Sequence, residues 1–210
     1  MKIYFDGCSW CWGAELKDPH QSRFSKIICD KLGAEEYNIS KNAAGNDRMV
    51  RQLLVDHKNI SEFDLVIIQL TYPERHEYYD KQKKKFVSNT NWKDVARLSL
   101  EQLRTVTYSK ERRKLLLENA ELDPKDKAWL DYYKYIYEEE YGDAYEDMNA
   151  TAIRSYCKAN NVPLILATVK RKRNSKLSYD VYCGDVPRAG GGHPNEEGHA
   201  IHAQQILELI

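Results

Sequence analysis

The sequence has no excess of either charge. Its 210 residues carry 32 Lys and Arg against 32 Asp and Glu, so the formal net charge is zero. Nucleic acids and anionic membranes usually recruit proteins through an excess of Lys and Arg. We therefore expect neither a nucleic acid nor a membrane as a partner, and the sequence says nothing about oligomeric state.

Long apolar runs are also missing. No stretch approaches the ~20 consecutive apolar residues that are needed to cross a bilayer. The first fifteen residues, MKIYFDGCSWCWGAE, lack the apolar core of a signal peptide. Cysteine is scarce and its count of 5 is odd, which argues against a disulfide framework. These features predict a soluble, cytoplasmic protein with reduced thiols.

Short apolar segments predict the strands of one sheet. Residues 64–70 (DLVIIQL) and 162–169 (VPLILATV) are continuous apolar runs, which are typical of strands covered on both faces of a parallel sheet. Further strands are expected at 2–6, which leads into the turn at Gly7, and at about 36–39. Amphipathic patterns predict helices at 22–32, after NAAGND, around 145–156, and from the cap residue Asn195 to about Leu209.

This alternation of strands and helices indicates an α/β fold of three layers with a mainly parallel sheet. One stretch, at about 76–142, departs from the pattern because it is polar, charged and rich in Trp and Tyr. It is too long for a plain strand-to-helix loop. We expect a helical insertion within a single domain of residues 1–210. It is either a cap beside the active site or a decoration that only covers the core.

Two residues far apart in the sequence are candidates for nucleophilic chemistry. Ser9 follows the first strand directly, where a strand-to-helix turn lifts a side chain out of the sheet and surrounds it with backbone N–H groups. His193 lies in a glycine-rich loop before the last helix. Both loops belong to the carboxyl end of the sheet, so the imidazole of His193 can meet and deprotonate the Ser9 hydroxyl. Taken singly, Ser9 is more simply a helix cap and His193 an incidental loop residue.

Three segments in order resemble the blocks of the SGNH, or GDSL-type, hydrolases: GCSWCWGAEL, NAAGN and HPNEEGH. The resemblance implies a flavodoxin-like α/β/α fold and hydrolysis of an ester through a serine acyl-enzyme, with Ser9 as nucleophile and His193 as base. It further implies an oxyanion hole built from the backbone N–H groups of Ser9 and Gly45. No cofactor and no metal are expected.

The chain departs from the family's third block, which usually supplies an oxyanion-hole Asn after the central strand. Here the strand is followed by TYPERHE, so Thr71 is the closest polar residue, and Asn46 can substitute from the neighbouring loop. In the same segment Arg75 and Glu77 are expected to bind substrate, Arg75 by clamping a carboxylate or phosphate. The alternative is that these two side chains pair with each other on the surface.

The family's acid, three residues before the histidine, is also missing, because that position is Gly190. Two carboxylates precede the loop, and we expect Asp185 rather than Asp180 to orient His193, since GDVPRAGGG is flexible enough to fold back. A Ser/His dyad without a carboxylate remains the alternative.

Three other functions compete with the esterase. Cys8 and Cys11 form a C-x-x-C at a strand-to-helix turn, as in a thiol oxidoreductase. His199 and His202 lie one helical turn apart, but no pattern of ligands completes a zinc site. A degenerate member of the fold that binds a glycan or protein without turnover is the main rival. The polar, Tyr-rich insertion favours a small-molecule or carbohydrate ester, with an O-acetyl or other acyl group, over a long acyl chain.

Overall fold

A computed structural model describes residues 1–57, 59–89, 124–170 and 179–210. Within these residues, one sheet of five strands runs in the order β2-β1-β3-β6-β7, and all of its neighbouring strands are parallel. This confirms the predicted α/β class with a parallel sheet. The strands are β1 (Lys2–Gly7), β2 (Glu35–Asn38), β3 (Leu65–Leu70), β6 (Leu164–Thr168) and β7 (Val181–Tyr182).

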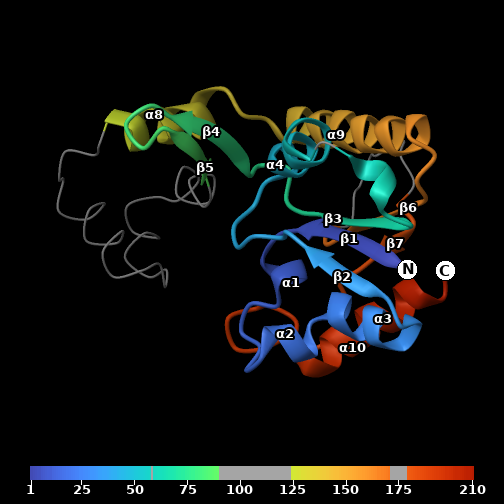
Figure 1. The fold of residues 1–210 in the computed structure, drawn as a ribbon. Helices are drawn as coiled ribbons and strands as arrows, with labels where there is room; N and C mark the ends of the chain where they lie inside the picture. The colour runs from blue at the N-terminus through green and yellow to red at the C-terminus, as the bar shows by residue number, and fades with distance from the viewer. Residues whose placement is uncertain (58, 90–123, 171–178) are drawn as a thin grey trace.

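Helices cover both faces of this sheet (Figure 1). Alternate residues of a strand point to opposite faces. On one face, Ile3 and Phe5 of β1 pack among the side chains of α3 (Phe24–Leu32) and α10 (Glu196–Leu207). On the other face, Tyr4 packs in a cluster with residues of α4 (Asn46–Arg51), the π-helical turn η1 (Gln52–Asp56) and α9 (Glu139–Ala159). The result is the expected α/β/α sandwich.

Most helices begin and end close to the predicted positions, although α9 begins six residues before the expected helix around 145–156. The Asn195 side chain accepts a hydrogen bond from the Gly198 N–H and so caps α10, as expected. The pattern at 22–32 belongs to two helices, because the chain is extended at Arg23 between α2 (Pro19–Ser22) and α3. A short 3-10 helix, η2 (Ile60–Glu62), precedes β3.

The tight turn from β1 into the next helix positions Ser9. The short helix α1 (Ser9–Trp12) begins immediately after β1, with Cys8 as its extended N-terminal cap residue. A Cβ atom at Gly7 would come within 2.6 Å of the Cys11 Cβ. Gly7 therefore permits the sharp approach of α1 to the end of the strand.

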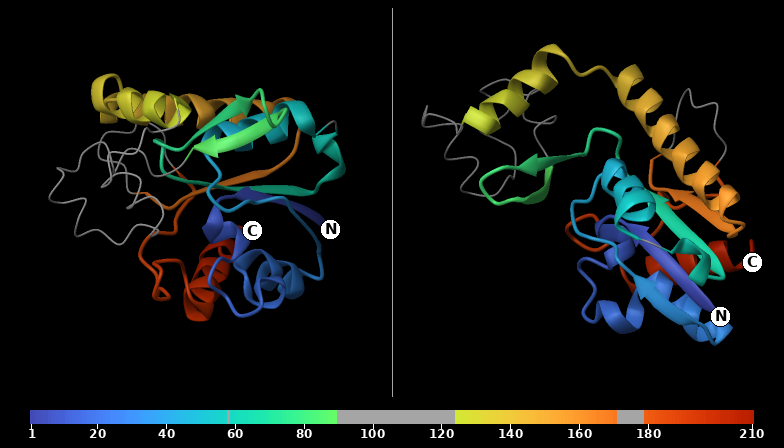
Figure 2. Two further views of the ribbon diagram at one scale, coloured as in Figure 1. Left: turned by 90° about the vertical axis from the view of Figure 1, so that its left-hand side faces the viewer. Right: turned by 45° about the horizontal axis from the view of Figure 1, so that its top comes forward.

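The insertion after β3 is not wholly helical. It begins with an antiparallel hairpin of β4 (His76–Asp80) and β5 (Lys85–Asn89) and ends with helix α8 (Pro124–Tyr135). Hairpin and helix lie beyond the end of the parallel sheet (Figure 2). The remainder of the predicted insertion, residues 90–123, lies outside the described residues. No helix in the described part of the chain is long and apolar enough to span a membrane.

Candidate active site

Ser9 and His193 lie together although they are 184 positions apart in the sequence. The Ser9 Oγ is 3.0 Å from the His193 Nε2. Ser9 is the first residue of α1, and His193 belongs to the loop that precedes α10. This distance is within the range of a hydrogen bond, so the imidazole is positioned to accept the serine proton.

The other ring nitrogen of His193 contacts a carboxylate that the sequence analysis did not select. The Glu15 Oε2 lies 2.9 Å from the His193 Nδ1 and 3.1 Å from the His193 backbone nitrogen. Hydrogen bonds from the backbone and the side chain of His193 lower the pKa of Glu15, so its carboxylate stays ionised at neutral pH. A serine hydroxyl, an imidazole and a carboxylate are thus arranged in series.

Asp185, the carboxylate expected to orient His193, lies elsewhere. Its Oδ1 is 3.4 Å from the Tyr182 hydroxyl. Asp180 accepts a hydrogen bond from the Leu166 N–H and supports the edge of the sheet instead. The expectation that the 184–192 segment folds freely back onto the ring did not account for its backbone hydrogen bonds, such as that from the Gly192 N–H to the Ala189 carbonyl.

Glu15 reaches His193 because of the turn that follows α1. Gly13 and Glu15 both adopt a positive φ, of 86° and 69° respectively. A non-glycine residue in this region of φ is uncommon and often marks a functional site. The Glu15 carboxylate also fits against Gly191, where a Cβ atom would come within 2.0 Å of the Glu15 Oε1. The signal in the sequence was the acid in GAEL, within the same block as Ser9.

The loop with Gly45 is tied to the end of β3. Asn46 accepts a hydrogen bond from the Thr71 N–H at 2.8 Å and donates one to the Thr71 carbonyl at 3.1 Å. The Thr71 hydroxyl accepts a hydrogen bond from Arg75 at 3.0 Å. Gly45 itself is extended, with φ of −95°, and a Cβ atom there would come within 2.4 Å of the Arg75 carbonyl oxygen. Close approach of two chain segments, rather than φ, requires glycine at this position.

A buried ion pair fixes the same loop against β1. Arg48 donates to the Asp6 Oδ1 at 2.7 Å and to the Ile39 carbonyl, also at 2.7 Å. Asp6 is completely buried two residues before Cys8, and burial raises its pKa to about 6 despite the guanidinium beside it. The pair therefore joins the first turn of α4 to β1, the strand that leads into Ser9.

Arg75 and Glu77 do not pair with each other. Glu77 accepts two hydrogen bonds from Arg51, at 2.7 and 3.0 Å. The Arg75 guanidinium lies over the Tyr72 ring, 5.1 Å from its centroid. Of the two expected substrate-binding residues, Arg75 is hydrogen-bonded to the Thr71 hydroxyl, whereas the Glu77 carboxylate is held by Arg51.

The thiols and histidines offer little support for the competing chemistries. Cys8 and Cys11 are both buried and not disulfide-bonded, and burial raises the pKa of Cys11 well above its ordinary value. A protonated thiol is a poor nucleophile. In the described ranges, no group of three or more His, Cys, Asp or Glu side chains is placed to hold a metal ion. His199 instead accepts a hydrogen bond from the Phe24 N–H, and His202 contacts the Cys183 carbonyl.

No protein-family model matches the chain, and no curated protein matches it. Among solved structures, it is similar to a lipolytic protein of the G-D-S-L family from Veillonella parvula, with 15% identity over 100% of this chain and 97% of the other (TM-score 0.42). It is similar to the psychrotrophic esterase EstA from Pseudoalteromonas, with 14% identity over 99% and 94% (TM-score 0.43). It is also similar to a family two carbohydrate esterase from Clostridium thermocellum in complex with cellohexaose, with 11% identity over 100% and 63% (TM-score 0.40).

Proposed function

We propose that this protein is a divergent SGNH-type serine esterase that cleaves an ester through an acyl-enzyme on Ser9. The observation that carries the proposal is the series Ser9 Oγ, His193 and Glu15, with consecutive separations of 3.0 and 2.9 Å. The order of the three sequence blocks supports the same assignment.

In the reaction, the His193 Nε2 accepts the Ser9 proton as the Oγ attacks the ester carbonyl carbon. The carbonyl oxygen becomes an oxyanion, for which the backbone N–H groups of Ser9 and Gly45 are the proposed donors. His193 then gives its proton to the leaving alcohol oxygen, which breaks the ester bond and leaves Ser9 acylated. Water, deprotonated by the same imidazole, attacks the acyl-enzyme and releases the acid and the free serine.

Glu15 takes the role for which the sequence suggested Asp185. Its ionised carboxylate holds the His193 Nδ1–H, fixes the ring with Nε2 toward Ser9, and stabilises the imidazolium that forms during attack. A lowered pKa suits this role, because the carboxylate must remain charged while the imidazole gains a proton.

Asn46 and Thr71 are proposed to position the oxyanion hole rather than to donate to it. Their two mutual hydrogen bonds hold the Gly45 loop at the end of β3. Arg75, whose guanidinium is bonded to the Thr71 hydroxyl, is the proposed contact for polar substrate atoms on this side.

Hydrolysis of p-nitrophenyl acetate tests the proposed function. The wild-type protein should release p-nitrophenol, and Ser9→Ala should lower kcat by at least about 10³-fold, since removing a catalytic serine in such a triad costs still more. Circular dichroism confirms that the variant is folded. Equal rates for a folded Ser9→Ala protein and the wild type would end the serine-hydrolase assignment. No activity in the wild type would favour the binding protein without turnover.

A further inference from the structure

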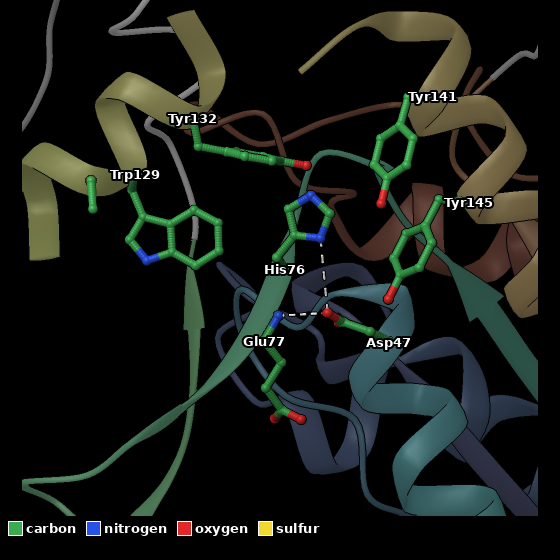
Figure 3. A pocket seen from close by; sticks show the side chains of 8 residues that line it. Asp47, His76, Glu77, Trp129, Tyr132, Tyr141 and Tyr145 are labelled. Atoms are coloured by element: carbon green, nitrogen blue, oxygen red, sulfur yellow. Dashed lines mark hydrogen bonds and ion pairs between the residues drawn. The ribbon is translucent and has the colours of Figure 1, made fainter. Parts of the chain in front are cut away.

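A cavity of about 430 Å³ lies between the insertion and the parallel-sheet domain. Its walls are rings from two helices, Trp129 and Tyr132 from α8 and Tyr141 and Tyr145 from α9 (Figure 3). The Tyr141 and Tyr145 rings are parallel, with their planes 8° apart. The volume falls within the usual range of small-molecule sites.

The floor of this aromatic pocket contains a histidine with an unsatisfied nitrogen. His76 is 8% exposed, and its Nε2 is buried without a hydrogen-bond partner. Its Nδ1 faces the Asp47 Oδ2 at 4.0 Å, while the opposite side of the ring points between Tyr132 and Tyr141 into the pocket (Figure 3). Burial lowers the pKa of His76, so the ring is neutral. A buried polar atom of this kind calls for a partner, and a ligand hydroxyl supplies one.

The carboxylates beside the pocket already have partners. Asp47 accepts hydrogen bonds from the backbone N–H groups of Arg48 and Glu77, at 2.8 and 2.6 Å. The Glu77 carboxylate is held by Arg51. A quaternary ammonium would use the rings, as in known aromatic cages, but it has no hydrogen bond to give to His76. A neutral ligand ring with hydroxyl groups can both stack on the aromatic side chains and form a hydrogen bond with His76.

The pocket shares one loop with the proposed active site, because Asp47 lines the pocket and Gly45 is a proposed oxyanion-hole donor. Asp47 follows Gly45 by two residues, a chain length that spans at most ~7 Å. We propose that the aromatic pocket binds one uncharged sugar ring of the carbohydrate that carries the ester, next to the group attacked at Ser9. The proposal rests on the esterase function and specifies its substrate class. The rings of α8 and α9 stack on the apolar face of the sugar, and His76 binds one of its hydroxyls.

Binding can be measured without turnover in the Ser9→Ala protein. The probes are xylotetraose, cellotetraose and chitotetraose. Their binding is measured by saturation-transfer NMR and by calorimetry. At least one should bind. Trp129→Leu and the more exposed Tyr141→Leu should each weaken binding by about tenfold or more, and His76→Phe by about fivefold through loss of one hydrogen bond. Tyr135→Leu, on the same helix but outside the pocket and 71% exposed, is the matched control and should bind as the parent does.

Three results would overturn the proposal. The first is no binding of any probe by the folded Ser9→Ala protein. The second is binding that the folded Trp129→Leu and Tyr141→Leu variants retain in full. The third is saturable binding of tetramethylammonium, lost in these variants, in the absence of sugar binding, which would identify a cation cage. Since these experiments need no catalysis, failure here leaves the p-nitrophenyl acetate result intact, and failure of the esterase assay leaves the binding result interpretable.

Discussion

At the scale of single residues, the orientation of the His193 ring depends on one carboxylate. Glu15 contacts both the backbone nitrogen and the Nδ1 of His193, so it holds the ring and the loop together. The Asp185 Oδ1 instead lies 3.4 Å from the Tyr182 hydroxyl. The two acids are therefore separable by mutation.

We expect Glu15→Gln to lower kcat for p-nitrophenyl acetate by about 10²- to 10⁴-fold, because the amide neither stabilises the imidazolium nor enforces the productive tautomer. Asp185→Asn is the matched control, and its kcat should stay within about twofold of the wild type. Steady-state kinetics on the two proteins measure both values. The reverse ranking would return the role of the acid to Asp185, and two silent variants would indicate a Ser/His dyad.

At the scale of structural elements, the loop before α10 is shaped to receive the Glu15 side chain. A methyl group at Gly191 would displace the flexible end of Glu15, whereas nothing lies within 4 Å of a Cβ atom at Gly190. Gly191→Ala should therefore reduce kcat by about tenfold or more, through loss of the carboxylate contact with His193, while the melting temperature changes little. Gly190→Ala should resemble the wild type in both measurements. Similar activity in the two variants would show that the loop does not constrain Glu15.

The ion pair between α4 and β1 is expected to contribute mainly to stability. Arg48→Ala leaves the Asp6 carboxylate buried without its partner, which typically costs about 3 to 5 kcal/mol. Lys26→Ala removes the surface pair with Asp30 on α3 and should cost less than about 1 kcal/mol. Urea unfolding of both variants gives the comparison. Equal costs would mean that the Asp6–Arg48 pair does not hold the Gly45 loop.

At the scale of the whole molecule, two buried histidines make stability depend on pH. Burial lowers the pKa of His199 to about 3 and that of His202 to about 4. As pH falls below the ordinary histidine value of about 6.5, the unfolded chain gains protons that the folded chain does not. Each buried histidine should thus lower the unfolding free energy by roughly 1 kcal/mol from about pH 7 to about pH 5.5, whereas the raised pKa of Asp6 acts in the opposite direction over this range.

The His202→Gln variant tests this pH dependence, since its amide can donate to the Cys183 carbonyl but does not titrate. Its unfolding free energy should vary less over this range than that of the wild type. His20→Gln, at an exposed site, should leave the dependence unchanged. Equal slopes for all three proteins would contradict the burial of a neutral His202.

Local patterns predicted most of the sheet and the ends of its helices, because continuous apolar runs and caps such as Asn195 act over a few residues. They predicted a helix around 145–156, whereas α9 covers Glu139–Ala159 and so begins inside the segment that was expected to be the insertion. The β4–β5 hairpin was missed because HEYYDKQKKKFVSN has no glycine turn. Glu15 was missed because its contact with His193 depends on a turn with a positive φ, which residue spacing does not reveal.

The central claim is that His193, held by Glu15, activates the Ser9 hydroxyl. Labelling with a fluorophosphonate, followed by mass spectrometry of the peptides, tests it most directly, because this reagent captures an activated serine whatever the natural substrate is. We predict one phosphonylated residue, Ser9, in the wild type, labelling at least tenfold slower in Glu15→Gln, and none in Ser9→Ala. A folded wild-type protein that is not labelled at Ser9 at any pH would contradict the claim.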